Sequence, residues 1–264
     1  MKATTPPHWT EHREELAARL GTVPRLLVAT DFDGTLTPIR PRPGEVEMPP
    51  GAKASLAALA SHPGVRVAVL SGRELADVAA LVDLPGVIYA GNHGLEIKGP
   101  GIDWVQPQAL ASRPRLDAAA VFLEDKLRGI DGAFVEHKRL SLSMHCRLVA
   151  AEQLAFVEQV AAECGAAFPE LKRHEGKKVV EFRPDVAWNK GYALKRLLKG
   201  LGLPAAAALY MGDDVTDEDA FEALKGLGTS LHVGENPATR ARCRLRNPED
   251  AAEFLDWLRK LRIP

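Results

Sequence analysis

Residues 26–36 read LLVATDFDGTL, an apolar run followed at once by two aspartates and a glycine. The run predicts a strand buried on both faces, and the alternation along a strand would point Asp31 and Asp33 to one side while Phe32 packs inward. Gly34 permits the sharp exit that a residue with a Cβ makes only at a cost. A plain turn is the alternative interpretation, because Asp-Gly is a common turn pair and acidic residues often cap helices. The later motifs of the chain favour a functional site.

Strand-like and helix-like segments alternate outward from this stretch. Apolar runs typical of strands occupy 65–70, 87–90, 207–211 and 230–233, and helical patterns occupy 51–61, 73–81, 190–198, 217–224 and 248–261. Such alternation predicts parallel strands joined by crossover helices. We therefore expect an α/β fold with a Rossmann-like, doubly wound parallel sheet as its core, preceded by an extra helix near 9–20.

The pattern changes in the middle of the chain. Short, half-exposed strands are predicted at 95–97, 133–137, 140–145 and 178–182, with amphipathic helices at 115–128 and 151–164 between them. This pattern favours an antiparallel sheet with helices on one face. We expect an inserted α/β cap domain at 99–184, between a first core part at 1–98 and a second at 185–264.

The composition suits an ordinary soluble enzyme. The 264 residues are 46% hydrophobic, and 34 basic against 35 acidic residues give a net charge of −1, which indicates neither a nucleic-acid nor an anionic-membrane partner. No run reaches transmembrane length and the N-terminus lacks the apolar centre of a signal peptide, so we expect a cytoplasmic protein. The three cysteines form no Cys-x-x-Cys pair and are expected to be reduced and structural. We expect a monomer.

Polar residues follow several of the predicted parallel strands, where ligands of such sheets bind. After 65–70 comes Ser71, whose hydroxyl could bind an anion beside a helix N-terminus or simply cap that helix. Lys190 stands at the start of a helix, where a cation opposes the helix dipole, which suggests a nearby anion. Simple solvation, which is common for lysines, is the alternative.

Residues 212–219 read GDDVTDED and pack five acids behind the strand at 207–211. Concentrated hard oxygen donors suit Mg²⁺, and a divalent cation would also relieve the repulsion between the aspartates of the first motif. Asp213, nearest the strand, is the predicted ligand. Asp214 and Asp217 are either alternative ligands or supporting residues, and part of the acidic run caps the next helix.

In order and spacing, these motifs resemble the haloacid dehalogenase superfamily of phosphatases across nearly the whole chain. The resemblance implies that Asp31 attacks phosphorus and becomes an aspartyl phosphate, and that Asp33 protonates the leaving oxygen and later activates water. It further implies that Ser71 and Lys190 bind the phosphoryl oxygens. The inserted segment lies where this superfamily carries its type C2 α/β cap, which we expect to close over the site.

The same resemblance implies a magnesium site. Its ligands would be the side chains of Asp31 and Asp213 and the main-chain carbonyl of Asp33, with Mg²⁺ neutralising charge on the transferring group.

Further segments look like those of trehalose-6-phosphate phosphatases, namely GNHG at 91–94, EHKRLS at 136–141 with His145 and Arg147, KVVEFRP at 178–184 and GDDVTDE at 212–218. One departure is Cys146, which stands where that family often has an aromatic residue. Carboxylates of the inserted segment could accept hydrogen bonds from sugar hydroxyls, and lysines could donate. A plain surface ion pair between Glu136 and Lys138, and a hinge role for His93, are the alternatives. The expected substrate contacts are Asp31, Phe32, Asp33, Arg73, Asn92, His93, Glu136, Lys138, Lys178 and Glu181.

The resemblance implies that the substrate is trehalose 6-phosphate, supplied by a separate synthase. Rival substrates of the same architecture are sucrose phosphate, glucosylglycerol phosphate and a hexose phosphate. A phosphomutase would retain the phosphoryl group, and a non-catalytic sugar-phosphate sensor would need vacated catalytic positions. The filled positions argue against the sensor.

Overall fold

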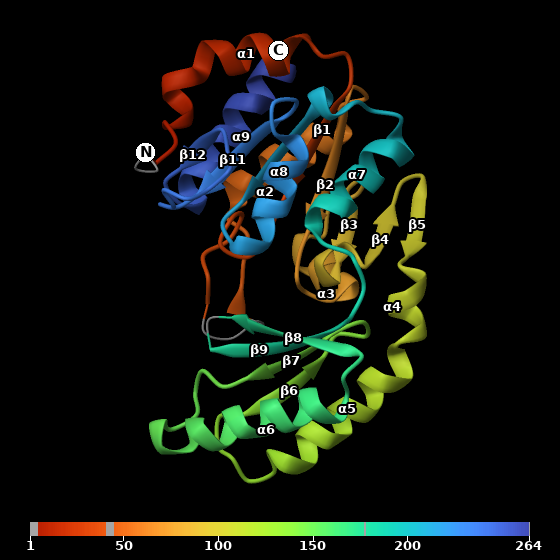
Figure 1. Ribbon diagram of the computed structural model, residues 1–264. Helices are drawn as coiled ribbons and strands as arrows, with labels where there is room; N and C mark the ends of the chain where they lie inside the picture. Colours follow the sequence, from red (N-terminus) through yellow and green to blue (C-terminus); the bar gives the residue numbers. More distant parts are fainter. Residues whose placement is uncertain (1–4, 41–44, 177, 264) are drawn as a thin grey trace. The chain divides into compact units, whose positions relative to one another are not determined.

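The computed structural model describes residues 5–40, 45–176 and 178–263. The chain forms two compact units, a core unit of Met1–Trp104 with Trp188–Pro264 and an inserted unit of Val105–Ala187. Figure 1 shows the elements of both. The sequence prediction placed the insertion at 99–184. The core unit extends to Trp104 because a strand after residue 99 joins its sheet.

The core unit is built on an eight-stranded sheet in the order β12-β11-β10-β1-β2-β3-β4-β5. The strands from β12 to β3 pair in parallel, whereas β4 pairs antiparallel with β3. This arrangement confirms the predicted α/β fold with a parallel core sheet. The strands are β1 (Leu26–Thr30), β2 (Val65–Leu70), β3 (Ile88–Gly91), β4 (Glu96–Gly99), β5 (Ile102–Val105), β10 (Ala208–Gly212), β11 (Thr229–Val233) and β12 (Cys243–Leu245).

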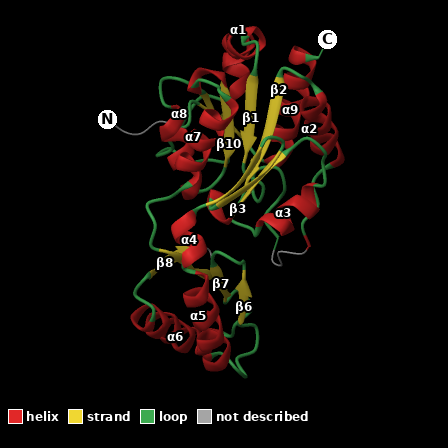
Figure 2. Cartoon of the chain, turned by 90° about the vertical axis from the view of Figure 1, so that its right-hand side faces the viewer, coloured by secondary structure: helices red, strands yellow, loops and turns green. Residues whose placement is uncertain are grey.

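Helices cover both faces of this sheet, as Figure 2 shows. Along β1, Leu26 and Val28 pack into one hydrophobic core while Leu27 and Ala29 pack into the other, because successive side chains point to opposite faces. The first core also holds α1 (Arg13–Thr22), α2 (Pro50–Ser61), α3 (Leu75–Val82) and α9 (Pro248–Arg262), and the second holds α7 (Lys190–Leu201) and α8 (Glu218–Leu224). A short 3₁₀ turn, Trp9–His12, precedes α1 in the N-terminal segment where a helix was expected.

The inserted unit has a four-stranded antiparallel sheet in the order β6-β7-β9-β8. Met144 of β7 and Phe182 of β9 are among the residues that pack into a core shared with α5 and α6, whereas their neighbours Ser143 and Glu181 point to the opposite face. Helices therefore cover one face of this antiparallel sheet, as predicted. The elements are α4 (Pro107–Ala111), α5 (Arg113–Lys126), β6 (Phe134–His137), β7 (Leu142–His145), α6 (Leu154–Ala167), β8 (Leu171–Gly176) and β9 (Val179–Pro184).

The predicted strand at 95–97 was grouped by its pattern with the antiparallel strands in the middle of the chain, although it precedes the predicted insertion at 99–184. In the structure, β4 lies in the core sheet beside β3. The 3₁₀ turn Asn92–Gly94 reverses the chain directly after β3, and so short a connection joins antiparallel neighbours.

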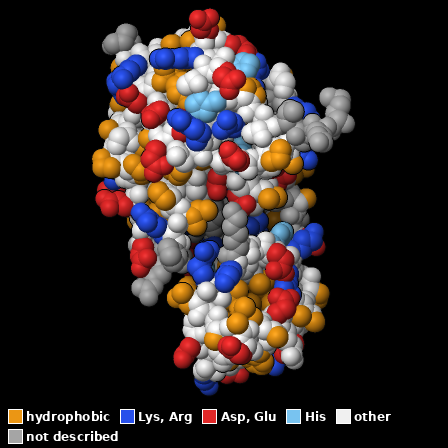
Figure 3. All heavy atoms as spheres, turned by 90° about the vertical axis from the view of Figure 1, so that its left-hand side faces the viewer, with side chains coloured by type: hydrophobic (Ala, Val, Ile, Leu, Met, Phe, Trp, Pro, Cys, Tyr) orange, Lys and Arg blue, Asp and Glu red, His pale blue; other side chains and the backbone are white. Residues whose placement is uncertain are grey.

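Within the described residues, no helix combines the length and apolar character needed to span a bilayer. Acidic and basic side chains are intermingled over the face drawn in Figure 3. This mixture agrees with the nearly neutral charge of the sequence.

Candidate active site

Two of the predicted motifs lie next to each other in the loops that follow β1 and β10, because these strands are neighbours in the sheet. The backbone N–H of Asp31 donates to the carbonyl of Met211 at 2.8 Å. The main chain of β1 is therefore still hydrogen-bonded to β10 at the first residue of the motif. Gly34 has a φ of +86°, and a Cβ at this position would lie 2.2 Å from Oδ2 of Asp213. Glycine is therefore required both by the backbone conformation and by the close approach of the two loops.

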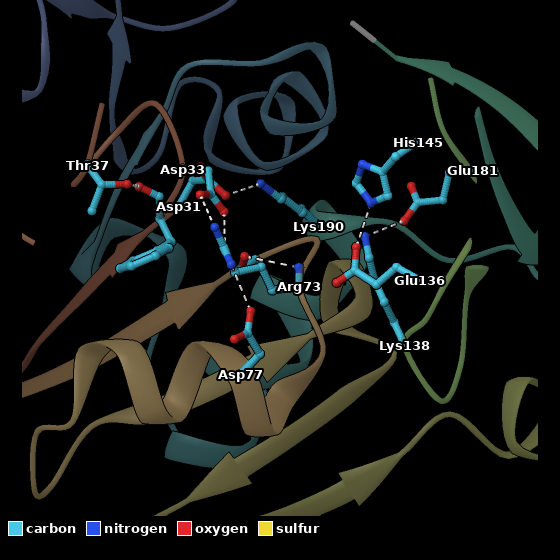
Figure 4. A network of polar contacts seen from close by, with 12 residues as sticks. Asp31, Asp33, Thr37, Arg73, Asp77, Glu136, Lys138, His145, Glu181 and Lys190 are labelled. Carbon is cyan, nitrogen blue, oxygen red and sulfur yellow. Dashed lines mark hydrogen bonds and ion pairs between the residues drawn. The ribbon is translucent and has the colours of Figure 1, made fainter. Parts of the chain in front are cut away.

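A buried lysine joins two of the predicted carboxylates (Figure 4 shows the first contact). Nζ of Lys190 donates to Oδ1 of Asp31 at 2.6 Å and to Oδ1 of Asp217 at 2.7 Å. Asn189 caps the start of α7 by accepting from the backbone N–H of Tyr192, which places Lys190 in the first turn. The lysine thus faces anions rather than solvent, as its position against the helix dipole predicted.

The pKa values of Asp31 and Lys190 depend both on their burial and on the charges beside them. Burial raises the pKa of the Asp31 carboxyl well above its usual range, the charge of Lys190 opposes that rise, and Asp217 and Asp213 add to it. Burial alone would lower the pKa of Lys190, but the carboxylates of Asp217 and Asp31 raise it above its usual value. The ammonium therefore stays charged and is the internal counterion of Asp31.

Asp217 is a fully buried anchor for this arrangement. Besides Lys190, its Oδ1 accepts from the hydroxyl of Tyr210 at 2.6 Å, and its Oδ2 accepts from the backbone N–H groups of Asp213 and Asp214, each at 3.0 Å. Sequence reasoning missed Tyr210, because in the sequence it is an ordinary aromatic residue within the apolar strand β10. Its buried hydroxyl gains significance only from the acceptor that the fold places beside it.

Three of these carboxylates could hold a metal ion. Asp31, Asp213 and Asp217 offer oxygens that lie within 4.8 Å of one another, and among the described residues they form the group with this property. Oxygen donors of this kind fit Mg²⁺. Both oxygens of Asp217 already accept two hydrogen bonds, so Asp31 and Asp213 are the better direct ligands. Asp214 is exposed and lies outside the group.

The loops after β2 and β3 bring further predicted residues to the same edge of the sheet. Oγ of Ser71 accepts from the backbone N–H of Arg73 at 3.1 Å, so it closes a local turn rather than capping α3, which begins at Leu75. The backbone N–H of Asn92 donates to the carbonyl of Arg73, and that of His93 to the carbonyl of Ser71. These bonds tie the two loops together.

The remaining members of the first motif have different surroundings. Phe32 is fully buried and packs in the hydrophobic core. Asp33 is partly exposed and accepts two hydrogen bonds from the guanidinium of Arg73, at 2.7 Å each, while Arg73 also donates to Asp77 at 2.8 Å. Sequence reasoning did not identify Asp77 or the pairing of Arg73 with Asp33.

In the inserted unit, a row of polar residues crosses the face of the sheet opposite α5 and α6. Glu136, Ser143 and Glu181 are direct neighbours across β6, β7 and β9. Oε1 of Glu181 accepts from Nζ of Lys138 at 3.4 Å, and its Oε2 accepts from Nε of Arg183 at 2.7 Å.

Two further positions complete this face. Oε2 of Glu136 lies 2.8 Å from Nε2 of His145, so Glu136 pairs with that histidine. Lys178 does not join the row, because it lies exposed in the turn between β8 and β9 with a φ of +63°.

Comparisons with known proteins agree with this geometry. A family model described as trehalose-phosphatase matches residues 29–248. A trehalose-phosphate phosphatase of Mycobacterium marinum is 41% identical over 241 residues, which are 88% of this chain and 61% of the relative. The chain therefore spans about three fifths of the length of such relatives.

Solved structures give the same result. The C-terminal domain of a Candida albicans trehalose-6-phosphate phosphatase is 25% identical with a TM-score of 0.78, and the match covers 98% of this chain and 99% of that domain. An Aspergillus fumigatus trehalose-6-phosphate phosphatase is 27% identical with a TM-score of 0.65, covering 97% and 99% of the two chains. The chain belongs to the trehalose-phosphatase family.

Proposed function

We propose that this chain hydrolyses trehalose 6-phosphate to trehalose and phosphate, with Asp31 as the nucleophile. The observation that carries the proposal is the buried Asp31 carboxylate, held at 2.6 Å by Lys190 beside Asp213 and Asp217, in a chain of the trehalose-phosphatase family. A buried carboxylate with a fixed cation at its side is suited to attack an electrophile that carries negative charge.

In the first step, an oxygen of Asp31 forms a bond to phosphorus as the bond between phosphorus and the sugar oxygen breaks. Lys190 stays charged next to Asp31, where it can donate to a phosphoryl oxygen and limit the repulsion between two anions. The Ser71 hydroxyl, buried at the same edge of the sheet, is the proposed second donor.

Asp33 is the proposed acid and base. It gives its proton to the leaving sugar oxygen, and the resulting carboxylate then takes a proton from the water that attacks the phosphoryl group on Asp31. Its side chain is 35% exposed, so a leaving alcohol and a water molecule can approach it, whereas the side chain of Asp31 is only 7% exposed. The second step breaks the bond between Asp31 and phosphorus and restores both carboxyl groups.

The donor set fits a magnesium ion. When bound by Asp31, Asp213 and the main-chain carbonyl of Asp33, Mg²⁺ would supply positive charge against the phosphoryl oxygens. Asp217 serves in this proposal as the group that orients Lys190 and the backbone of Asp213.

The sugar is proposed to be selected by the inserted unit. Glu136 and Glu181 are acceptors and Lys138 is a donor on one polar face, and such groups suit the hydroxyls of a disaccharide. Asn92 and His93 of the core unit, and Lys178 in its exposed turn, stay on the proposed contact set.

The test is phosphate release from trehalose 6-phosphate, sucrose phosphate, glucosylglycerol phosphate, glucose 6-phosphate and p-nitrophenyl phosphate, with Mg²⁺ and with EDTA. We expect the highest kcat/KM for trehalose 6-phosphate, loss of activity in EDTA and recovery on adding Mg²⁺. A higher kcat/KM for another sugar phosphate would contradict the proposed substrate. Undiminished activity in EDTA would contradict the metal.

A further inference from the structure

Arg73 was expected to contact the substrate, but the structure commits its guanidinium to protein carboxylates. Nε and Nη2 donate to the two oxygens of Asp33 at 2.7 Å each, and Nη1 donates to Oδ2 of Asp77 at 2.8 Å. Three of the five N–H groups of the guanidinium, one on each nitrogen, are thus engaged by protein carboxylates. The fork formed by Nε and Nη2 is occupied by Asp33, so a phosphoryl group could bind at this fork only by displacing that carboxylate.

The surroundings of Arg73 fix its position. Its backbone is held from both sides, by Oγ of Ser71 on its N–H and by the N–H of Asn92 on its carbonyl. Its guanidinium carbon lies 5.6 Å from the ring centre of Phe32, and its side chain is 9% exposed. A rigid donor on a tied loop can determine where a partner carboxylate lies.

Asp33 depends on this donor. It follows the buried β1, its side chain is 35% exposed, and both of its carboxylate hydrogen bonds within the described part of the chain come from Arg73 (Figure 4). Two parallel N–H···O bonds fix the direction of a carboxylate as well as its distance.

We propose that Arg73 is a positioning residue for Asp33, with Asp77 holding the guanidinium in turn. The inference rests on the proposed function, in which Asp33 transfers protons to the leaving oxygen and from water. The two-point contact fixes the direction of the Asp33 carboxyl group, and so determines where this proposed acid and base lies.

Leaving groups of different acidity test this role. p-Nitrophenolate departs without a proton, whereas the alcohol of a sugar needs one. For Arg73→Lys, which keeps the charge but loses the fork, we expect kcat/KM for trehalose 6-phosphate to fall about 10²-fold or more and that for p-nitrophenyl phosphate to fall less than about tenfold. Inhibition by inorganic phosphate should be unchanged.

A phosphoryl-binding role gives the opposite pattern. Both substrates carry the same phosphoryl group, so equal falls in kcat/KM and weaker inhibition by phosphate would overturn the proposal. Asp77 contacts Arg73 and lies outside the proposed substrate contacts. Asp77→Asn should lower kcat/KM more for trehalose 6-phosphate than for p-nitrophenyl phosphate, as Arg73→Lys does, but to a smaller extent. Equal losses in this variant would also count against the proposal, and it serves if Arg73→Lys fails to fold.

A matched control separates this role from general effects. Arg66 lies near the other end of β2, where it donates to the carbonyls of Pro63 and Val65. Arg66→Lys should leave kcat/KM unchanged for both substrates. If the wild-type chain fails to hydrolyse trehalose 6-phosphate, the proposed function is wrong. The role of Arg73 can then still be tested by comparing the effect of Arg73→Lys on kcat/KM for phenyl phosphate with its effect on kcat/KM for p-nitrophenyl phosphate. If wild-type hydrolysis is normal and the variant loses both activities equally, only the inference about Arg73 fails.

Discussion

Lys190 lies between two carboxylates that would repel each other in its absence. Its side chain is 3% exposed, and those of Asp31 and Asp217 are 7% and 0% exposed. In such surroundings, removal of one partner leaves an uncompensated charge, which costs more than the pair itself contributes. The lysine is therefore needed for stability as well as for the proposed chemistry.

Replacing this lysine gives the first prediction. Lys190→Met should lower the free energy of unfolding by about 3–5 kcal/mol, because the buried carboxyl groups of Asp31 and Asp217 lose the cation that both contact. Phosphate release should fall about 10²-fold or more, since a fixed donor to the phosphoryl oxygens is lost. Urea denaturation and a phosphate assay measure the two effects.

Lys195→Met is the matched control, because Lys195 lies exposed on the same helix and its ammonium stacks over the ring of Tyr192. It should change stability by less than about 0.5 kcal/mol. If Lys190→Met unfolded at the same urea concentration as this control, the charge argument would be wrong.

The site residues differ in how visible they are in the sequence. Asp31, Lys190 and Asp213 follow predicted strands or open predicted helices, so the parallel topology alone brings them to one edge of the sheet. Tyr210 and Asp77 could not be found this way. Their significance depends on which atoms of Asp217 and Arg73 lie within hydrogen-bond distance, and that is set by side-chain packing rather than by spacing along the chain.

At the scale of elements, Asp250 joins the N-terminal segment to α9. Its carboxylate accepts from Nε1 of Trp9 at 3.3 Å and from the backbone N–H of Arg246 at 2.8 Å, and it lies 2.6 Å from Nε2 of His8. Burial would raise the pKa of Asp250, but hydrogen bonds from the guanidinium and the backbone of Arg246, together with those from His8 and Trp9, hold it well below its usual range.

Replacement of this residue gives the second prediction. Asp250→Asn should lower the free energy of unfolding at pH 7 by about 2–3 kcal/mol, because hydrogen bonds to a charged group are lost. Asp256→Asn is the control on the same helix, since Asp256 forms exposed pairs with Arg259 and Lys260, and it should cost less than about 1 kcal/mol.

The pH dependence of this contribution has a definite sign. A carboxyl with a lowered folded-state pKa stabilises the fold above the unfolded value of about 4, and this stabilisation is lost as the pH falls below it toward the folded value. The difference between the wild-type chain and Asp250→Asn should therefore shrink on acidification. Urea denaturation at several pH values measures it, and a difference that grew would contradict the assignment.

Most long elements could be predicted, but several edge strands could not. β2 was predicted from its apolar pattern, which Arg66 alone interrupts, whereas β8 reads LKRHEG and is an edge strand with exposed charged residues. Charged side chains protect such edges from unwanted pairing and hide the strand pattern at the same time. β12 has only three residues and pairs with β11, so tertiary pairing rather than local pattern defines it.

At the scale of the molecule, the proposed chemistry and the proposed sugar selection belong to different units. Glu181→Gln should therefore lower kcat/KM for trehalose 6-phosphate by about 10–150-fold, the value of a hydrogen bond to a charged group, and change that for p-nitrophenyl phosphate by less than about threefold.

Glu175→Gln is the matched control in the inserted unit, because Glu175 is exposed on β8 and pairs with Arg173. This variant should leave kcat/KM unchanged for both substrates. Equal losses on both substrates in Glu181→Gln, with an intact circular dichroism spectrum, would contradict the division of roles.

The central claim is that the carboxylate of Asp31 bonds to phosphorus in every turnover. Rapid quenching of the reaction with ³²P-labelled trehalose 6-phosphate, followed by peptide mapping, tests it most directly. We predict a label that is sensitive to hydroxylamine on the peptide containing Asp31, and its absence from Asp31→Asn together with an about 10³-fold or greater loss of turnover. Product formation by the wild-type chain without any label on that peptide, or rapid turnover by Asp31→Asn, would contradict the claim.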